Sequence, residues 1–227
     1  MSRVLAVVTN QATYGRSTHR TGLWIGELVH FHAGILQAGF EADIVSPSGG
    51  RVPLDPRSVK LADRTTRKYM ADRAFMSGLD DSARAADMDP NRYAGIFYTG
   101  GHGVMWDFPE DSALQATARQ IYENGGVVSS VCHGACGLLN IRLSDGSLLV
   151  DGRKVTGFST NEERVSFVKN RVPFLLEDEL RQRGAHYVRG KLPMAPCAVT
   201  DGRLVTGQNP YSTKAVTKKI IEVLQRL

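Results

Sequence analysis

The stretch VVSSVCHG, residues Val127–Gly134, decides the fold that the sequence predicts. Its first five residues are apolar or small and favour a buried strand, and Ala135–Asn140 can begin a helix directly afterwards. Cys132 therefore stands where a strand turns into a helix. A turn of this kind presents a nucleophile at the edge of a parallel sheet, here with Cys in place of the more usual Ser.

Outward from this stretch, short β-branched runs alternate with segments of helical periodicity. This alternation predicts an α/β fold, with a mostly parallel, doubly wound sheet and helices on both faces. The expected strands are Arg3–Val8, Glu41–Ser46, Ala94–Thr99, Val127–Val131, Lys154–Thr156 and a hairpin pair around Asp201-Gly202. The expected helices are Gly22–Ala38, Asp111–Asn124, Pro173–Arg183 and Tyr211–Arg226.

Composition limits the class of protein. With 42% hydrophobic and 22% charged residues, the 227-residue chain is neither disordered nor a coiled coil. The net charge of +5 is scattered, which argues against a nucleic-acid partner. No apolar run approaches the roughly 18 residues of a membrane helix, so no membrane partner is expected. The three cysteines suggest a reducing compartment, and the start does not resemble a signal peptide. We expect a cytoplasmic protein.

Residues 1–227 are expected to form a single domain, since no linker interrupts the alternation. Residues 51–91 carry many charges, few apolar anchors and no strong period. A segment of this length without a clear pattern is typical of an insertion, a lid or an interface element.

Cys132 is the principal candidate for chemistry. The N-terminus of a helix is expected to lower the pKa of a thiol there and so to favour the thiolate. The backbone amides of His133 and Gly101 could bind an oxyanion, because the loop Gly100–Gly103 follows a strand that ends at the same sheet edge. The alternative is that Cys132 is a small buried core residue, which is the commonest fate of a free cysteine.

Three carboxylates are candidates from position alone. Glu27 borders the apolar face of the first helix, and the pattern by itself favours a solvent-facing side chain. Glu162 and Glu163 follow a strand end, where they can approach the site, form the acidic first turn of a helix capped by Ser159 or Thr160, or do both.

These segments resemble the ThiJ/PfpI superfamily, relatives of the class I glutamine amidotransferase domain, and within it the branch of heat-shock chaperones and glutathione-independent glyoxalases (glyoxalase III). The likeness covers nearly the whole chain in order. It rests on Cys132-His133-Gly134, Gly101-His102-Gly103, Asp107-Phe108-Pro109, Thr21-Gly22 leading to Glu27, Gly39–Asp43, Asn124–Val128, Thr156–Phe158 and Thr200–Pro210.

The resemblance implies a flavodoxin-like sheet and a role for each of four residues. Cys132 matches the family nucleophile, His133 its neighbour in a triad, and Glu163 the third acid, with Glu162 as the alternative because the match is loose there. Glu27 matches a buried carboxylate that lies against the nucleophilic sulfur. One departure is Ala135, where the family often has proline.

The activity that this resemblance implies is a cofactor-free glyoxalase, a lyase of the D-lactate dehydratase type that converts methylglyoxal or a similar 2-oxoaldehyde into a 2-hydroxy acid. No metal and no cofactor are expected, the partner is a small-molecule substrate, and the chain is expected to form a homodimer. Two alternatives use the same fold: an amidase or peptidase that acts through Cys132, and a holdase chaperone in stress response.

Overall fold

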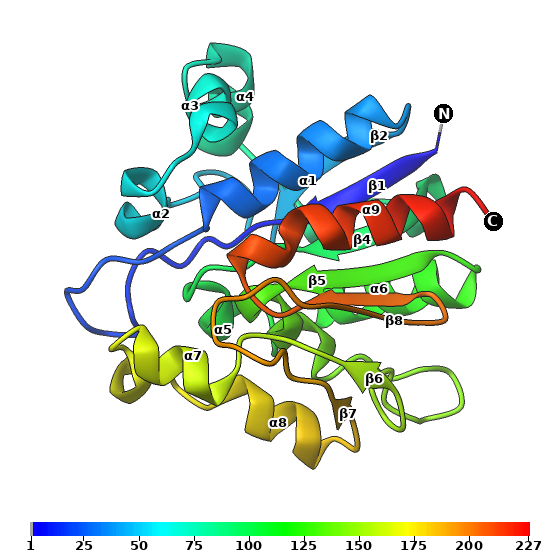
Figure 1. Ribbon diagram of the computed structural model, residues 1–227. Helices are drawn as coiled ribbons and strands as arrows, with labels where there is room; N and C mark the ends of the chain where they lie inside the picture. Colours follow the sequence, from blue (N-terminus) through cyan, green and yellow to red (C-terminus); the bar gives the residue numbers. More distant parts are fainter. Residues whose placement is uncertain (1) are drawn as a thin grey trace.

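The computed structural model describes residues 2–227 and centres on a seven-stranded sheet (Figure 1). The strand order is β3-β2-β1-β4-β5-β9-β8, and every neighbouring pair is parallel except β8 and β9. The strands are β1 (Arg3–Val7), β2 (Glu41–Ser46), β3 (Ala83–Arg84), β4 (Tyr93–Tyr98), β5 (Val127–Val131), β8 (Ala198–Asp201) and β9 (Leu204–Gly207). The predicted α/β class with a mostly parallel sheet is confirmed.

Helices cover both faces of this sheet. Helices α1 (Ile25–Gln37) and α9 (Thr213–Leu224) pack side by side on one face, and α6 (Ser112–Glu123) covers β4 and β5 from the other (Figure 1). The stacked rings of Phe31 on α1 and Phe97 on β4, 4.0 Å apart between centroids, join helix to sheet in the core. Because helices cover both faces of the sheet, the strands are buried on both sides, and their sequences do not alternate strictly between apolar and polar residues.

Smaller elements complete the chain. They are α5 (Val104–Asp107), α7 (Thr160–Val165), α8 (Leu176–Gln182), the paired strands β6 (Lys154–Val155) and β7 (His186–Tyr187), and the 3₁₀ helices η1 (Ala85–Asp87), η2 (Pro90–Arg92), η3 (Cys132–Leu138), η4 (Lys169–Arg171) and η5 (Pro210–Ser212). Within residues 2–227, no helix combines the length and apolar character needed to cross a bilayer.

Two predicted helices begin later than expected. Residues Gly22–Trp24 are extended instead of helical, because the amide of Leu23 donates to Pro53 O and that of Trp24 to Gly100 O. Helix α1 therefore starts at Ile25. Helix α8 starts at Leu176, three residues after Pro173.

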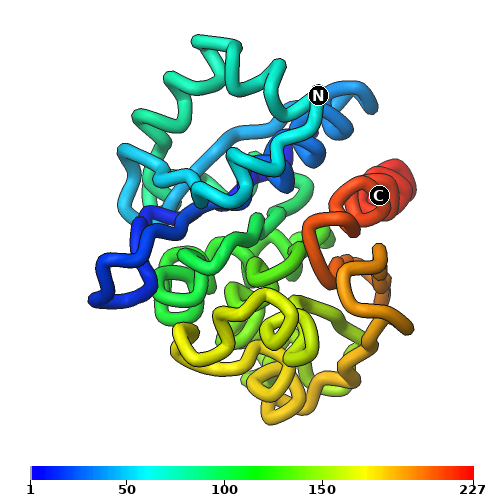
Figure 2. Tube along the Cα trace, turned by 60° about the vertical axis from the view of Figure 1, so that its left-hand side comes forward, coloured from blue at the N-terminus to red at the C-terminus, as the bar shows by residue number. Residues whose placement is uncertain are grey.

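Residues 51–91 contain three short helices, α2 (Pro56–Lys60), α3 (Arg64–Met70) and α4 (Arg73–Asp80), followed by edge strand β3. Each helix has an aspartate N-cap whose side chain accepts backbone hydrogen bonds: Asp55, Asp63 and Asp72. In Figure 2 this cyan and teal segment lies on the opposite side of the green central loops from the yellow segment that contains α7 and α8. Whether it moves as a lid stays a prediction.

The carboxyl ends of β4 and β5 bring two loops into contact. The strands pair in parallel with Tyr98 opposite Ser130, so the loop after Thr99 meets the turn at Cys132. The approach is close enough that a Cβ on Gly134 would collide with the carbonyl oxygens of Tyr98 and Thr99. Glycine at 134 is therefore a steric requirement of this sheet edge.

We expect Gly134→Ala to lower the free energy of unfolding by about 1–3 kcal/mol, since the rigid backbone must shift to admit the methyl group. Gly78→Ala on exposed helix α4 is the matched control, because its added Cβ would meet nothing within 4 Å. That control should be neutral or more stable by about 0.4–1 kcal/mol. Urea denaturation of both variants measures the difference, and equal stabilities would contradict this account.

Candidate active site

Cys132 occupies the sharp turn between β5 and η3. Its backbone φ is +59°, a left-handed conformation that is strained for a residue with a side chain. The side chain is only 2% exposed, and Sγ lies 3.4 Å from Nδ1 of His133. The predicted strand-to-helix turn is present, but the segment that follows is 3₁₀ rather than α-helical.

The expected lowering of the thiol pKa is wrong for the resting site. Burial and the neighbouring charge of Glu27 raise the pKa of the Cys132 thiol well above its usual value, and the backbone amide of His133 only partly opposes them. Burial has a larger effect on the thiol pKa than the helix N-terminus does, because burial removes the water that would stabilise the thiolate. A base beside the sulfur is therefore needed to form the nucleophile.

Glu27 on α1 is completely buried, which agrees with the resemblance and not with the solvent-facing position that the helical pattern favoured. Its Oε2 accepts a hydrogen bond of 2.6 Å from the amide of Gly100. Burial raises the pKa of Glu27 to about 8, although the Gly100 amide and the Cys132 thiol lower it in part. A carboxyl group with this pKa can give and take a proton near neutral pH.

His133 lies between the thiol and Glu163. Nε2 of His133 is 2.5 Å from Oε1 of Glu163, so its Nδ1 is the nitrogen that faces Cys132. The ring packs against Phe158, with centroids 4.3 Å apart. Burial opposes ionisation of Glu163, but the charge and hydrogen bonds of the neighbouring histidines outweigh it and hold the pKa of Glu163 well below its usual value.

The two acids have different contacts. Glu162 accepts hydrogen bonds from Ser159 in a capping box and from Asn209, so it closes the start of α7. Glu163 reaches His133. Of the two, Glu163 is the acid that contacts His133, and its role in the reaction stays a prediction.

Gly101, predicted to donate to an oxyanion, lies in the loop that follows β4. Its φ of +106° and the approach of the Trp24 backbone nitrogen, 2.7 Å from where a Cβ would be, both require glycine. Among residues 2–227 its N–H has no hydrogen-bond acceptor, so it is available to a ligand. Gly101, Cys132 and His133 all line one pocket of about 380 Å³.

The walls of this pocket are mainly apolar. They include Trp24, Phe158, Met194 and Tyr211, and helix α2 adds Arg57, Lys60 and Leu61 at the pocket edge. Glu27 is not among the lining residues; it is buried next to the Cys132 thiol, with Oε2 held by the Gly100 amide. A small substrate can therefore reach the thiol while the acid is shielded from water.

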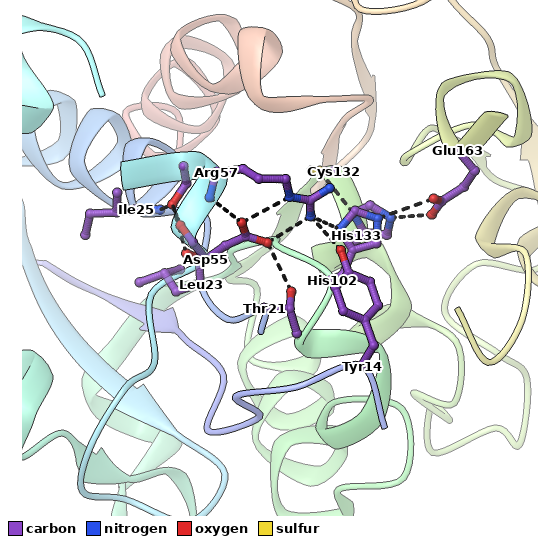
Figure 3. Close-up of polar contacts among 11 residues, drawn as sticks. Tyr14, Thr21, Leu23, Ile25, Asp55, Arg57, His102, Cys132, His133 and Glu163 are labelled. Carbon is purple, nitrogen blue, oxygen red and sulfur yellow. Dashed lines mark hydrogen bonds and ion pairs between the residues drawn. The ribbon is translucent and has the colours of Figure 1, made fainter. Parts of the chain in front are cut away.

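Sequence reasoning missed three residues of the site: His102, Arg57 and Asp55. Figure 3 shows them in a continuous set of polar contacts that ends at Glu163 and His133. His102 Nε2 is 3.3 Å from Oε2 of Glu163, and burial together with the charge of His133 lowers the pKa of His102 to about 4. The dipeptide Asp55-Pro56 is a helix-start signal, and could have located α2 but not its contacts.

One set of residues has ligand types suited to a divalent metal ion. A ligand atom each of His102, His133 and Glu163 lies within 4.8 Å of the others. Both imidazoles are hydrogen-bonded to Glu163, however, and Arg57 Nη2 already donates to Nδ1 of His102 at 2.9 Å. An ion on Nε2 of His102 would require the proton on Nδ1, against the guanidinium, so the residues present do not fit a metal well.

Comparison with known proteins places this geometry in a family. A probable glutathione-independent glyoxalase, hsp3103, of Schizosaccharomyces pombe is 32% identical, over 90% of each chain. The structure of a 24 kDa Rapid Encystment Protein of Francisella tularensis is 36% identical with a TM-score of 0.95, over 99% of each chain. That of glyoxalase III from Candida albicans is 29% identical with a TM-score of 0.88, over 98% of this chain and 97% of the other.

The model of the DJ-1/PfpI family matches residues 27–223, a range that holds Glu27, Cys132, His133 and Glu163. The resemblance expected from the sequence is thereby confirmed, including its glyoxalase branch. This chain belongs to the DJ-1/PfpI family.

Proposed function

We propose that this protein is a glutathione-independent glyoxalase, which converts methylglyoxal or a related 2-oxoaldehyde into the 2-hydroxy acid with water as the only co-reactant. The observation that carries the proposal is Glu27, a buried carboxyl with a pKa raised to about 8, beside the thiol of Cys132. The names of the curated relatives support the same activity.

The first step forms a carbon–sulfur bond. Nδ1 of His133 takes the proton of the Cys132 thiol, and the sulfur adds to the aldehyde carbon of the substrate. The aldehyde oxygen becomes negative and is stabilised by the amides of Gly101 and His133. His133 then returns the proton to this oxygen, which gives a neutral hemithioacetal.

The second step moves one hydrogen between neighbouring carbons. The carboxylate of Glu27 removes the proton from the former aldehyde carbon, and the electron pair of that C–H bond forms an enediolate. Glu27 then delivers the proton to the adjacent carbon while the hydroxyl proton on the former aldehyde oxygen passes to the neighbouring oxygen, which leaves a thioester of the 2-hydroxy acid on Cys132. Water attacks the thioester with His133 as base, and the departing sulfur recovers a proton.

Replacement of the nucleophile is the primary test. We expect Cys132→Ser to reduce formation of lactate from methylglyoxal, without glutathione, by about a thousandfold or more. Cys136→Ser is the matched control, because Cys136 is also buried and its Sγ donates a hydrogen bond to Val104 O, 3.2 Å away, rather than facing the site. Equal rates for wild type and Cys132→Ser would contradict the proposal.

The same samples test the two alternatives. Hydrolysis of amide or peptide substrates through Cys132, with little loss of methylglyoxal, would favour an amidase or peptidase. Suppression of aggregation that survives Cys132→Ser, with no lactate formed, would favour a holdase.

The pKa of Glu27 sets the expected pH dependence. Only the ionised carboxyl can remove the carbon-bound proton, and it accumulates as the pH rises toward its pKa of about 8. We expect kcat/KM to rise about tenfold per pH unit well below that value and to level off above it. A stopped assay of lactate between pH 5.5 and 9 measures the profile.

Glu27→Gln provides the partner measurement. Its neutral amide has nearly the same shape but cannot accept the proton, so kcat should fall by about 10²–10⁴-fold. The remaining activity should lose its rise toward pH 8. A variant that keeps both the rate and the pH profile of wild type would remove Glu27 from the mechanism.

A further inference from the structure

Among residues 2–227, Arg57 forms no hydrogen bond or ion pair with the proposed triad, but its contact with His102 leads there (Figure 3). We propose that Arg57 is a positioning residue: it fixes His102 in the neutral tautomer that carries its proton on Nε2, so that His102 holds Glu163 in place for His133. The effect on turnover rests on the proposed function, whereas the tautomer can be measured without it.

Two neighbours of His102 determine which nitrogen carries the proton. Arg57 Nη2 lies 2.9 Å from Nδ1, and a guanidinium nitrogen can only donate, so Nδ1 must accept. Oε2 of Glu163 lies 3.3 Å from Nε2, and a carboxylate can only accept, so Nε2 must donate. The opposite tautomer would place N–H against N–H at one end and a lone pair against a carboxylate at the other.

Arg57 is itself held by a buried acid. Asp55 is fully buried; its Oδ1 accepts from Nε of Arg57 at 3.2 Å, and its Oδ2 from Nη2 at 2.9 Å. The hydroxyl of Thr21 donates to Oδ2 of Asp55 at 3.1 Å. The hydroxyl oxygen of Tyr14 lies 2.6 Å from Arg57 Nη2, so the two hydrogens of Nη2 are shared among Asp55, Tyr14 and His102. A two-point contact between guanidinium and carboxylate fixes the plane of the arginine as well as its position.

The two histidines have different tasks. Their rings lie 4.0 Å apart between centroids, and the positive charge of one disfavours a charge on the other. Burial, and then the charges of His133 and Arg57, lower the pKa of His102 and keep it neutral. Glu163 receives one imidazole on each oxygen, and its orientation toward His133 depends on the hydrogen bond from His102.

Through Arg57, the segment of residues 51–91 therefore contributes a side chain to the site. When Arg57 is removed, His102 can adopt the Nδ1–H tautomer, in which its lone pair faces Glu163, or can take up a proton and compete with His133 for the same carboxylate. Partners of this indirect kind contribute about 10–100-fold to function at comparable sites. We expect kcat to fall by such a factor in Arg57→Met, with little change in KM for methylglyoxal.

The direct test is ¹⁵N NMR of protein labelled at the imidazole nitrogens, recorded at neutral pH. The chain has six histidines, and the His102 signals are those that disappear in His102→Gln. Wild type should show His102 neutral with its proton on Nε2. Arg57→Met should show the Nδ1–H form, a mixture or the cation, and Arg57→Lys, which keeps one charged donor, should retain part of the wild-type form.

Lys60→Met is the matched control for these spectra. Lys60 lies on the same short helix and also borders the pocket, but makes no contact with His102. It should leave the His102 tautomer unchanged. A wild-type His102 that carries its proton on Nδ1 or is cationic, or an unchanged His102 signal in a folded Arg57→Met, would overturn the proposal.

A double-mutant cycle tests whether Arg57 acts through His102. If it does, Arg57→Met combined with His102→Gln should lower kcat no further than His102→Gln alone. Multiplicative losses would show that Arg57 acts on the substrate or elsewhere, and would overturn the positioning role. If wild type itself makes no lactate, the glyoxalase proposal fails, and the spectra still decide the tautomer.

Discussion

The rest of the site depends on the contact between two backbones at the ends of β4 and β5. The left-handed turn at Cys132 is packed against Tyr98, Thr99 and Gly100 so closely that Gly134 has no space for a side chain. This contact gives the thiol its direction, and it also brings the Gly100 amide to Glu27. Strain at one residue is tolerated because the neighbouring parallel strands determine its position from both sides.

The two buried acids of the site are kept in opposite ionisation states by what each one contacts. Glu27 contacts one backbone amide and a thiol. These two partners do not compensate for the loss of water, so the pKa of Glu27 is raised to about 8. Glu163 meets two imidazoles and stays ionised in spite of similar burial. Carboxyl groups whose pKa values are separated in this way can act as a proton carrier and as a fixed charge.

The sequence was sufficient for features that depend on local pattern. The strand before Cys132 and the strand-end loop at Gly101 both follow from neighbouring residues. The contact of Arg57 with His102 joins residues 45 positions apart, and no periodicity within 51–91 indicates it. The thiol pKa was mispredicted because position at a helix start is visible in a sequence, whereas complete burial beside Glu27 is not.

The three short helices of residues 51–91 are the elements expected to unfold locally before the sheet does. Short, capped and partly exposed elements open at a lower free energy than the strands of a buried sheet. Opening of α2 alone would withdraw the guanidinium of Arg57 from His102 while β1, β4 and β5 stay paired. With the positioning role proposed for Arg57, the geometry at Cys132 then depends on the local stability of this short helix, and a mild denaturant that leaves the sheet intact should disturb it.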